Sequence, residues 1–360
     1  MNRLTLPELE AYIHTIDTAQ YAQRRNYLGE STELSEYISR GMISLPRVRE
    51  LVLQNNSAAA SAKLINELAW REYWQLVWRV RGDSIFDYIR PLMTPTRDGL
   101  PTAVVTATTG IAALDDGIRQ LQRTGYIHNH MRLWLAGLIC NVAHCDWRLG
   151  AAWMHSYLID GDYASNHLSW QWVAGSYTGK PYLPQQDNIN IYSKTTQRAS
   201  YLDQPYEVIA DMAIPIQLEP ITKELPPQKA LIPNSTIELK ELAGATEVLL
   251  YSPWTLDPMW RRESRATKVL LLDPAIFVPG RFNQNVIDSI MWFAAQIPDM
   301  KLLYSAPATL ENQAAALYRK DYPGIATWPG TVDAPVLLFP NVATKFYPSF
   351  SAFWKRASTS

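Results

Sequence analysis

The chain contains, at residues 158–172, the run Leu158-Ile159-Asp160-Gly161-Asp162-Tyr163-Ala164-Ser165-Asn166-His167-Leu168-Ser169-Trp170-Gln171-Trp172. Two shorter runs precede it, Thr124-Gly125-Tyr126-Ile127-His128-Asn129-His130-Met131-Arg132-Leu133 and Asp146-Trp147-Arg148. Together they bring carboxylates, amides, guanidinium groups and indoles into one region of the sequence. The order and spacing of these runs, more than the composition of the chain, carry the information about its fold.

A fourth run, Glu67-Leu68-Ala69-Trp70-Arg71-Glu72-Tyr73-Trp74, has the spacing of one helix face. Positions 67, 70, 71 and 74 stand at i, i+3, i+4 and i+7, so an acid, two indoles and a guanidinium share that face. A buried face tolerates this mixture only if its polar groups find partners. Two interpretations stay open for this run alone: a face that meets a polar, planar ligand, or a tryptophan-rich core stripe in which Glu67 and Arg71 pair with each other.

Helical patterns dominate the first part of the chain. Pro7 and Pro46 stand where prolines begin helices, in the first turn. Apolar residues recur at three- and four-residue steps from 57 to 80. Further helices are predicted at about 110–124, 127–145 and 149–159. Strand-like alternation is scarce, so we predict an all-α domain over residues 1–212.

The composition changes after residue 212. Five prolines interrupt any long element between residues 213 and 245, where we predict a proline-rich linker. Beyond it, short apolar runs at 247–251, 268–272 and 301–304 predict strands, and residues 285–296 and 310–319 have helical patterns. This alternation predicts a small α/β domain over residues 246–360. No glycine-rich nucleotide fingerprint follows its first strand.

Charge and cysteine content limit the functional classes. The net charge of -1 offers no general attraction to nucleic acid, so DNA binding would need a local basic patch. Cys140 and Cys145 are too few for a zinc framework or a four-cysteine iron–sulfur cluster, and we expect buried, reduced thiols. The N-terminal residues lack an apolar signal-peptide core, and no run of eighteen apolar residues occurs. We therefore expect a cytoplasmic protein without a membrane partner or a metal cluster.

The four runs gain a specific meaning when two earlier ones are added, Tyr21-Ala22-Gln23-Arg24-Arg25-Asn26 and Ser31-Thr32-Glu33-Leu34-Ser35. With Arg119-Gln120-Leu121 between them, they resemble in order and spacing the flavin-binding half of DNA photolyases and cryptochromes. The resemblance covers roughly residues 20 to 195. It implies an all-α photolyase-type domain that binds flavin adenine dinucleotide (FAD) in a bent form, followed by the small α/β domain.

The resemblance implies an FAD site with two parts. A loop with hydroxyl and backbone N–H donors at a helix start suits the pyrophosphate, and Asn166 would face the flavin N5. Arg132 would pair with Asp160 near the flavin ring, where either charge left alone is costly. Without the resemblance, Ser31 or Thr32 is an ordinary N-cap and Asn166 a helix cap. The implied FAD contacts are Tyr21, Ser31, Thr32, Leu34, Ser35, Arg71, Arg132, Asp160, Gly161, Asp162 and Asn166.

The resemblance also implies a lesion pocket, because repair enzymes of this family act on a pyrimidine dimer flipped out of DNA. Two indoles, Trp70 and Trp172, would stack on the dimer, each worth about 1–3 kcal/mol per base. Glu67 and Asn129 would hydrogen-bond its base edges, and Arg25 would contact a DNA phosphate. Since Asn129 stands where (6-4) enzymes carry a histidine, the cyclobutane dimer is the expected substrate.

Trp170 and Trp147 match the two inner members of the family's tryptophan relay, although plain core packing is the alternative interpretation. The outer tryptophan has no counterpart, because residues 79–133 contain none. A tyrosine, Trp134 or Trp153 could instead be the outer residue from which the relay takes its electrons. His130 replaces a family arginine, so DNA binding is expected to be weak and salt-sensitive.

The chain departs from the family pattern in its domain architecture. Family members begin with an α/β antenna domain, whereas the flavin motifs here begin at residue 21. We therefore expect a short form without that N-terminal domain and predict no antenna chromophore. Three functions stay open: a DNA photolyase that repairs cyclobutane pyrimidine dimers, with single-stranded DNA as a candidate preferred form; a cryptochrome-type blue-light photoreceptor; and a flavin-binding scaffold without repair activity.

Overall fold

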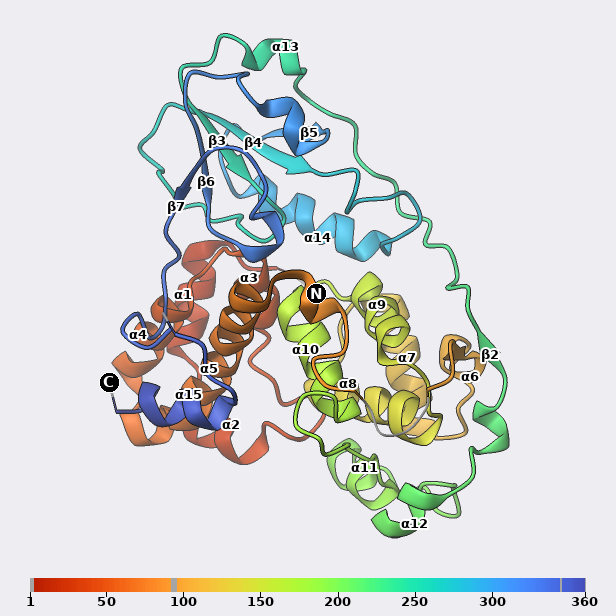
Figure 1. Cartoon of the computed structure of the whole chain (residues 1–360). Helices are drawn as coiled ribbons and strands as arrows, with labels where there is room; N and C mark the ends of the chain where they lie inside the picture. The colour runs from red at the N-terminus through yellow and green to blue at the C-terminus, as the bar shows by residue number, and fades with distance from the viewer. Residues whose placement is uncertain (1–2, 92–95, 344, 360) are drawn as a thin grey trace. The chain divides into compact units, whose positions relative to one another are not determined.

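The computed structural model describes residues 3–91, 96–343 and 345–359. They form two compact units. Unit 1 comprises Met1–Thr18, Glu33–Leu76 and Gln228–Ser360, and unit 2 comprises Ala19–Thr32 and Val77–Pro227. The boundary between the units falls inside the long helix α5 (Ala58–Arg81) (Figure 1).

Unit 1 combines helices with a parallel sheet. Its sheet has the order β5-β4-β3-β6-β7, and every neighbouring pair is parallel. All four residues of β3 are buried, as expected for the central strand of a parallel sheet. The strands are β3 (Val248–Tyr251), β4 (Thr267–Leu272), β5 (Lys301–Tyr304), β6 (Leu317–Lys320) and β7 (Thr331–Asp333). The helices besides α5 are α1 (Leu6–His14), α3 (Ser35–Arg40), α4 (Leu45–Asn55), α13 (Leu239–Leu242), α14 (Gln284–Ala295) and α15 (Phe350–Ala357).

The strand order reverses between β3 and β6, and ligands of open α/β sheets bind beyond the carboxyl ends of strands at such a point. Here the end of α3 lies against the segment that follows β3. Leu256 N donates to Arg40 O at 2.7 Å. A Cβ on Gly41, whose φ is +83°, would lie only 2.9 Å from Trp254 O. The residues after β3 therefore pack against the end of helix α3. Helix α14, which runs along one face of the sheet, also contacts α3, because Ser289 Oγ donates to Glu36 at 2.6 Å (Figure 1).

Unit 2 is a helical bundle around a tryptophan-rich core. Its helices are α2 (Thr18–Arg24), α6 (Thr102–Val105), α7 (Ala112–Thr124), α8 (Asn129–Gly137), α9 (Trp147–Tyr157), α10 (Tyr163–Ala174), α11 (Gln186–Ser193) and α12 (Tyr206–Asp211). The short strands β1 (Leu100–Pro101) and β2 (Ile221–Thr222) pair antiparallel. Four indoles lie in one apolar cluster of this unit, those of Trp134, Trp147, Trp153 and Trp170.

Local sequence signals account for the ends of the central helices. The Asp146 carboxylate accepts from Arg148 N at 2.8 Å and begins α9, and Asp162 accepts from Ser165 N at 2.7 Å and begins α10. Helix α7 ends at Gly125, which has a φ of 75°. Helix α8 passes into a wider π-helical turn at Leu138–Val142. The helix predicted at 127–145 is therefore present but changes its winding.

Most predicted elements are confirmed, and one is wrong. The patterns at 57–80, 110–124 and 285–296 form α5, α7 and α14. The helix predicted at 310–319 is instead a 3-10 turn (Pro307–Leu310) followed by strand β6. Leu317–Arg319 pair with β3, and the buried Arg319 guanidinium donates to Trp328 O at 3.0 Å. Long-range pairing thus overrides the helical preference of an alanine-rich segment.

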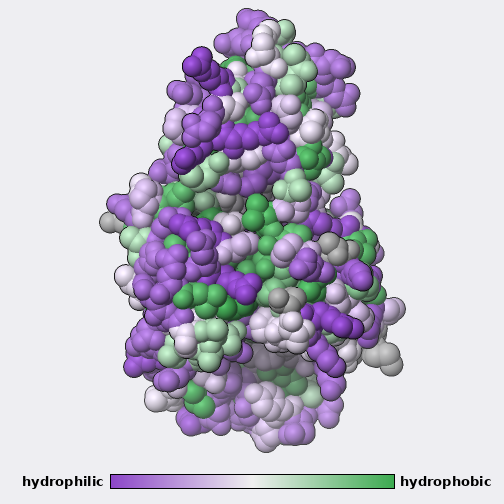
Figure 2. Space-filling view, turned by 90° about the vertical axis from the view of Figure 1, so that its left-hand side faces the viewer, coloured by the Kyte–Doolittle hydropathy of each residue, from purple (hydrophilic) through white to green (hydrophobic). Residues whose placement is uncertain are grey.

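The fold therefore combines a helical bundle with a small parallel α/β sheet, as the sequence predicted. The predicted boundaries, 1–212 for the helical domain, 213–245 for the linker and 246–360 for the α/β domain, stay a prediction. Cys140 and Cys145 are buried free thiols, and burial raises the pKa of both. On the face drawn in Figure 2, hydrophilic residues cover most of the surface, and hydrophobic residues form patches between them. None of the helices in the described ranges combines the length and apolar character needed to cross a bilayer.

Candidate functional site

An ion pair connects α8 with the turn before α10 in unit 2. Arg132 Nη2 lies 2.8 Å from Asp160 Oδ2, and Arg132 Nε donates to Ile127 O at 3.0 Å. The Asp160 side chain is only 2% exposed, whereas that of Arg132 is 23% exposed. The predicted pairing of these residues is therefore present in the structure, and removing the guanidinium would leave a buried charge without its cation.

The residues after Asp160 form a tight connection into α10. A Cβ on Gly161 would lie 2.9 Å from Leu158 O, so a side chain at this turn would displace backbone. Asp162 is buried and caps α10. The half-buried Asn166 donates through Nδ2 to Ala151 O at 2.9 Å. Because its nitrogen is committed, the Asn166 amide presents its oxygen as an acceptor.

Trp147 and Trp170 lie on the neighbouring helices α9 and α10 and belong to one apolar cluster. Trp147 is fully buried and Trp170 is 2% exposed. Gly150 lies one turn along α9 from Trp147, and a Cβ there would be 2.5 Å from Trp170 Cζ3. The missing side chain thus lets the Trp170 ring lie against α9 at Gly150. Trp147 Nε1 is buried, and within the described part of the chain it has no hydrogen-bond partner.

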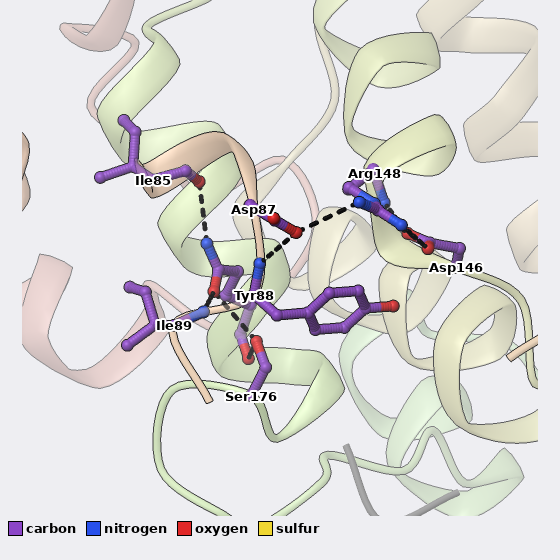
Figure 3. A network of polar contacts seen from close by, with 8 residues as sticks. Ile85, Asp87, Tyr88, Ile89, Asp146, Arg148 and Ser176 are labelled. Carbon is purple, nitrogen blue, oxygen red and sulfur yellow. Dashed lines mark hydrogen bonds and ion pairs between the residues drawn. The ribbon is translucent and has the colours of Figure 1, made fainter. Parts of the chain in front are cut away.

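Polar contacts surround the segment that carries Tyr88 (Figure 3). The Tyr88 and Trp147 ring centroids are 6.1 Å apart, with an interplanar angle of 86°. Arg148 bridges Asp146 at 2.7 Å and Asp87 at 3.1 Å, and its guanidinium lies 5.1 Å from the Tyr88 ring centre. The sequence runs had not singled out Tyr88, because it is 59 positions from Trp147 and only the fold brings the two together.

The other predicted residues of unit 2 lie in four places: α2 and its end, the loop before α3, the start of α8, and α10. Ser31 Oγ accepts from Tyr126 Oη at 3.0 Å, so the loop before α3 is tied to the segment before α8. Asn129 is exposed at the first position of α8. Trp172, on α10, is half-buried, and its ring lies 6.1 Å from that of Tyr182. Tyr21, Arg25 and Thr32 are half-buried.

His130 follows Asn129 in the first turn of α8. Its ring stacks on Trp134, with centroids 5.4 Å apart at an angle of 3°. The ring centroids of His130 and Tyr192 are 4.9 Å apart. The Nδ1 atom of His130 hydrogen-bonds Asn26 O at 2.7 Å. Burial lowers the pKa of His130. The residue is therefore part of an aromatic stack rather than an exposed cation.

Unit 1 holds the predicted residues of α3 and α5. Leu34 is buried directly before α3, and Ser35 is the first residue of that helix. Glu67, Trp70 and Arg71 are half-buried on α5. One face of Trp70 stacks on Phe350 of α15, with ring centroids 3.7 Å apart at an angle of 12°.

Glu72, a neighbour of the predicted residues on α5, has a separate task. This buried carboxylate accepts backbone N–H groups of Leu338 and Phe339, the latter at 2.8 Å. Tyr73 Oη donates to Tyr347 O at 3.1 Å. Helix α5 therefore anchors the C-terminal segment of unit 1. No pattern in the sequence pointed to Phe350 or to the role of Glu72.

The side chains of unit 2 fit the chemistry of FAD. Ser31 and Thr32 carry hydroxyl groups suited to a phosphate, and the Arg132–Asp160 pair and the Asn166 oxygen offer a cation, an anion and an acceptor for a flavin ring. Trp170 and Trp147 add two oxidisable rings in the same unit. When bound, FAD would supply absorption of visible light and exchange of single electrons, and these residues of unit 2 would hold and orient it.

Comparison with known proteins agrees with this chemistry. Residues 64–218 match the family described as FAD binding domain of DNA photolyase. A deoxyribodipyrimidine photo-lyase of Halobacterium salinarum is 28% identical over 207 residues, which are 54% of this chain and 42% of that relative. A cryptochrome DASH of Natronomonas pharaonis is 28% identical over 276 residues, 71% of this chain and 49% of that relative. A solved Synechocystis cryptochrome is 24% identical, with a TM-score of 0.48 over 53% of this chain and 44% of that one.

The chain spans less than half the length of each of these relatives. The matched segment contains Arg132, Asp160, Asn166 and both buried tryptophans of the α9–α10 interface. The match therefore covers the residues whose geometry suits a flavin. Residues 64–218 are therefore similar to the FAD-binding domain of DNA photolyases, and parts of the chain are similar to a photo-lyase and to a cryptochrome DASH.

Proposed function

We propose that this chain is a light-driven flavin electron-transfer protein that repairs cyclobutane pyrimidine dimers, with single-stranded DNA as its favoured substrate. The observation that carries the proposal is the buried pair of Trp147 and Trp170 at the α9–α10 interface of the FAD-binding domain. Buried, oxidisable indoles on two neighbouring helices of such a domain suit electron transfer to its cofactor. Single strands are favoured because less work is needed to unstack the lesion.

Four side chains are proposed to receive the dimer: Glu67, Trp70, Asn129 and Trp172. Trp70 and Trp172 are half-buried and Asn129 is exposed, so part of each is accessible. Arg25 is proposed as a phosphate contact. Because Phe350 covers one face of Trp70, stacking of a lesion on that face requires α15 to move away.

The covered face of Trp70 favours a second candidate, a blue-light photoreceptor of the cryptochrome type. In that function, photoreduction of the flavin would change a partner surface on the C-terminal segment, and Phe350 would stay on Trp70. Both functions use the same cofactor and the same buried tryptophans. They differ in whether the protein acts on DNA.

Purified protein with a flavin visible absorption spectrum should be reduced and illuminated with a dimer-containing oligothymidine. Return of thymine absorbance is expected, with faster return on single strands than on duplex. Trp172→Ala should lose lesion affinity and retain the flavin spectrum, whereas Thr178→Ala, at an exposed position beyond α10, should repair normally. Bound flavin without any return of absorbance would contradict repair and leave the photoreceptor. If the bound flavin also fails to become photoreduced, the protein would be a flavin-binding scaffold without repair activity.

A further inference from the structure

Three aromatic side chains gather in unit 2, where the segment after α2 meets α8 and α11. They are Tyr27, His130 and Tyr192, and each is half-buried. The Tyr192 ring stacks on His130, with centroids 4.9 Å apart at an angle of 28°. It meets Tyr27 edge to face, with centroids 5.2 Å apart at an angle of 71°. We call these three rings the aromatic platform, and the buried Trp134 supports it through its stack on His130.

Main-chain contacts fix the platform from within the domain. His130 Nδ1 hydrogen-bonds Asn26 O at 2.7 Å, and Leu28 N donates to Tyr192 O at 2.8 Å. Both neighbours of Tyr27 in the chain are therefore attached to the other two rings of the platform. Because the rings are already held in place, a planar group that stacks on them costs little conformational freedom of the protein, which favours binding.

Positive charge lies beside the platform. The exposed Lys194 extends over the Tyr27 ring, with Nζ 5.9 Å from the ring centre. Burial lowers the pKa of His130, and the nearby charge of Arg25 acts in the same direction. An anionic chain would therefore meet the ammonium of Lys194 and the guanidinium of Arg25 here, whereas His130 at neutral pH offers only its ring.

The platform adjoins two residues that the proposed function assigns to DNA. Asn26 and Tyr27 directly follow Arg25, the proposed phosphate contact, and His130 directly follows Asn129, a proposed contact of the dimer. Since consecutive Cα atoms are about 3.8 Å apart, the platform lies within a nucleotide's reach of both positions. A strand held by Arg25 and Asn129 therefore brings the nucleotide next to its lesion to Tyr27.

Single-stranded DNA suits this combination of rings and cations. Unpaired bases stack on aromatic rings with about 1–3 kcal/mol per base, and the phosphates between them attract cations. In a duplex the same bases are paired and stacked on one another, so Tyr27 cannot reach their faces. An apolar partner would leave the ammonium of Lys194 without a counter-charge. Glu30, a carboxylate of the same segment, lies 3.6 Å from Arg24, which offsets its repulsion of phosphates.

We propose that the aromatic platform binds the nucleotide next to the lesion in single-stranded DNA, with its base stacked on Tyr27 and its phosphate held by Lys194; this rests on the proposed function. His130 and Tyr192 support the Tyr27 ring. The platform gives the proposed preference for single strands a physical cause, because it adds affinity only where the flanking base is unpaired.

The test measures the fluorescence anisotropy of labelled, dimer-containing oligothymidine with the flavin-loaded protein in the dark. Tyr27→Ala should bind single strands about tenfold more weakly, which corresponds to about 1.4 kcal/mol, and should bind duplex as the wild type does. Tyr27→Phe should match the wild type, because it retains the ring. Tyr206→Ala is the matched control, since it removes a tyrosine of the same unit that is 45% exposed.

Salt dependence separates stacking from charge. The logarithm of the binding constant should fall linearly with the logarithm of the salt concentration, and Lys194→Ala should reduce that slope by about 0.7, the value for one phosphate of a single strand. Tyr27→Ala should leave the slope unchanged, because a stacked base releases no counterion. A slope that Lys194→Ala does not alter would contradict the phosphate contact.

A crosslink tests the contact even if Tyr27→Ala loses its fold or its flavin. An undamaged oligothymidine that carries one iodouracil should crosslink to Tyr27 of the wild type under ultraviolet light, as mapped by mass spectrometry. The same strand should leave Tyr206 unmodified.

The outcomes separate this inference from the proposed function. Unchanged single-strand affinity in Tyr27→Ala, an equal loss for single strands and duplex, or a crosslink on Tyr206 instead of Tyr27 would overturn the platform, whether or not dimers are repaired. A protein that shows the expected losses and the crosslink, but restores no thymine absorbance under light, would contradict repair and leave the platform as a binding surface for single strands.

Discussion

Trp70 and Phe350 stack face to face within unit 1, with ring centroids 3.7 Å apart and planes 12° from parallel. Phe350 is the first residue of α15, and Ser349 caps that helix by accepting from Ala352 N. The indole that the family resemblance assigns to a dimer is therefore covered on one face by a planar ring of the chain's own C-terminal segment. This contact links the stability of unit 1 to the proposed lesion site.

Phe350→Ala should lower the free energy of unfolding by about 3 kcal/mol, because Phe350 is 8% exposed and its removal leaves a cavity against Trp70. If the stack competes with DNA, the same variant should bind a dimer-containing oligothymidine more tightly. Urea unfolding and fluorescence anisotropy measure the two effects. Ser351→Ala, at the next and exposed position of α15, is the control for both. Unchanged affinity would show that the covered face of Trp70 does not receive DNA.

Arg132→Ala should remove the guanidinium that lies 2.8 Å from Asp160 and should cost about 3–5 kcal/mol of unfolding free energy, since the Asp160 side chain is only 2% exposed. We also expect loss of bound FAD, read from the ratio of flavin to protein absorbance. Arg119→Ala removes an exposed arginine whose partner Asp116 is 78% exposed and is the matched control. Full flavin occupancy in Arg132→Ala would argue against the assignment of this pair to the cofactor.

Gly150→Ala should disturb the tryptophan pair, because the new Cβ would lie 2.5 Å from Trp170 Cζ3 inside the core. Overpacking of this kind typically costs about 1–3 kcal/mol. The displaced Trp170 should also slow flavin photoreduction, which is measured by the bleaching of its visible absorption. Gly244→Ala is the control, because a Cβ there meets nothing within 4 Å. Equal photoreduction in both variants would mean that Trp170 does not donate to the flavin.

His128 should make the protein sensitive to acid. Its Nδ1 accepts from His130 N at 3.2 Å and caps α8, and burial, with the charge of His130 adding to it, lowers the pKa of His128 to about 4. The unfolded chain takes up this proton near its ordinary value, whereas the folded chain does so only near 4. Stability is therefore full above the unfolded pKa and falls as the pH drops from the ordinary value towards 4, by at most about 3 kcal/mol.

His128→Asn keeps a good N-cap without a titrating group. Urea unfolding of both proteins across this pH range should show a flatter dependence for the variant. An identical loss of stability with acid in the two proteins would place the titrating group elsewhere.

The sequence by itself determined the elements that local patterns encode. The apolar spacing of 57–80 was enough to predict α5. The order and spacing of several motifs between residues 21 and 172 gave a family resemblance, which implied the FAD-binding domain and the Arg132–Asp160 pair. Periodicity, capping and motif spacing act over a few turns, so they can be read without knowing the rest of the chain.

Only the tertiary structure decided contacts between distant segments. The strand at Leu317–Lys320 replaced a predicted helix because it pairs with β3, about seventy residues earlier. Phe350 covers Trp70, Tyr88 adjoins Trp147, and Trp170 fits against Gly150. No local sequence pattern predicts these contacts. Such contacts depend on which surfaces the folded chain presses together, and the free energy of that packing is distributed over residues far apart in the sequence.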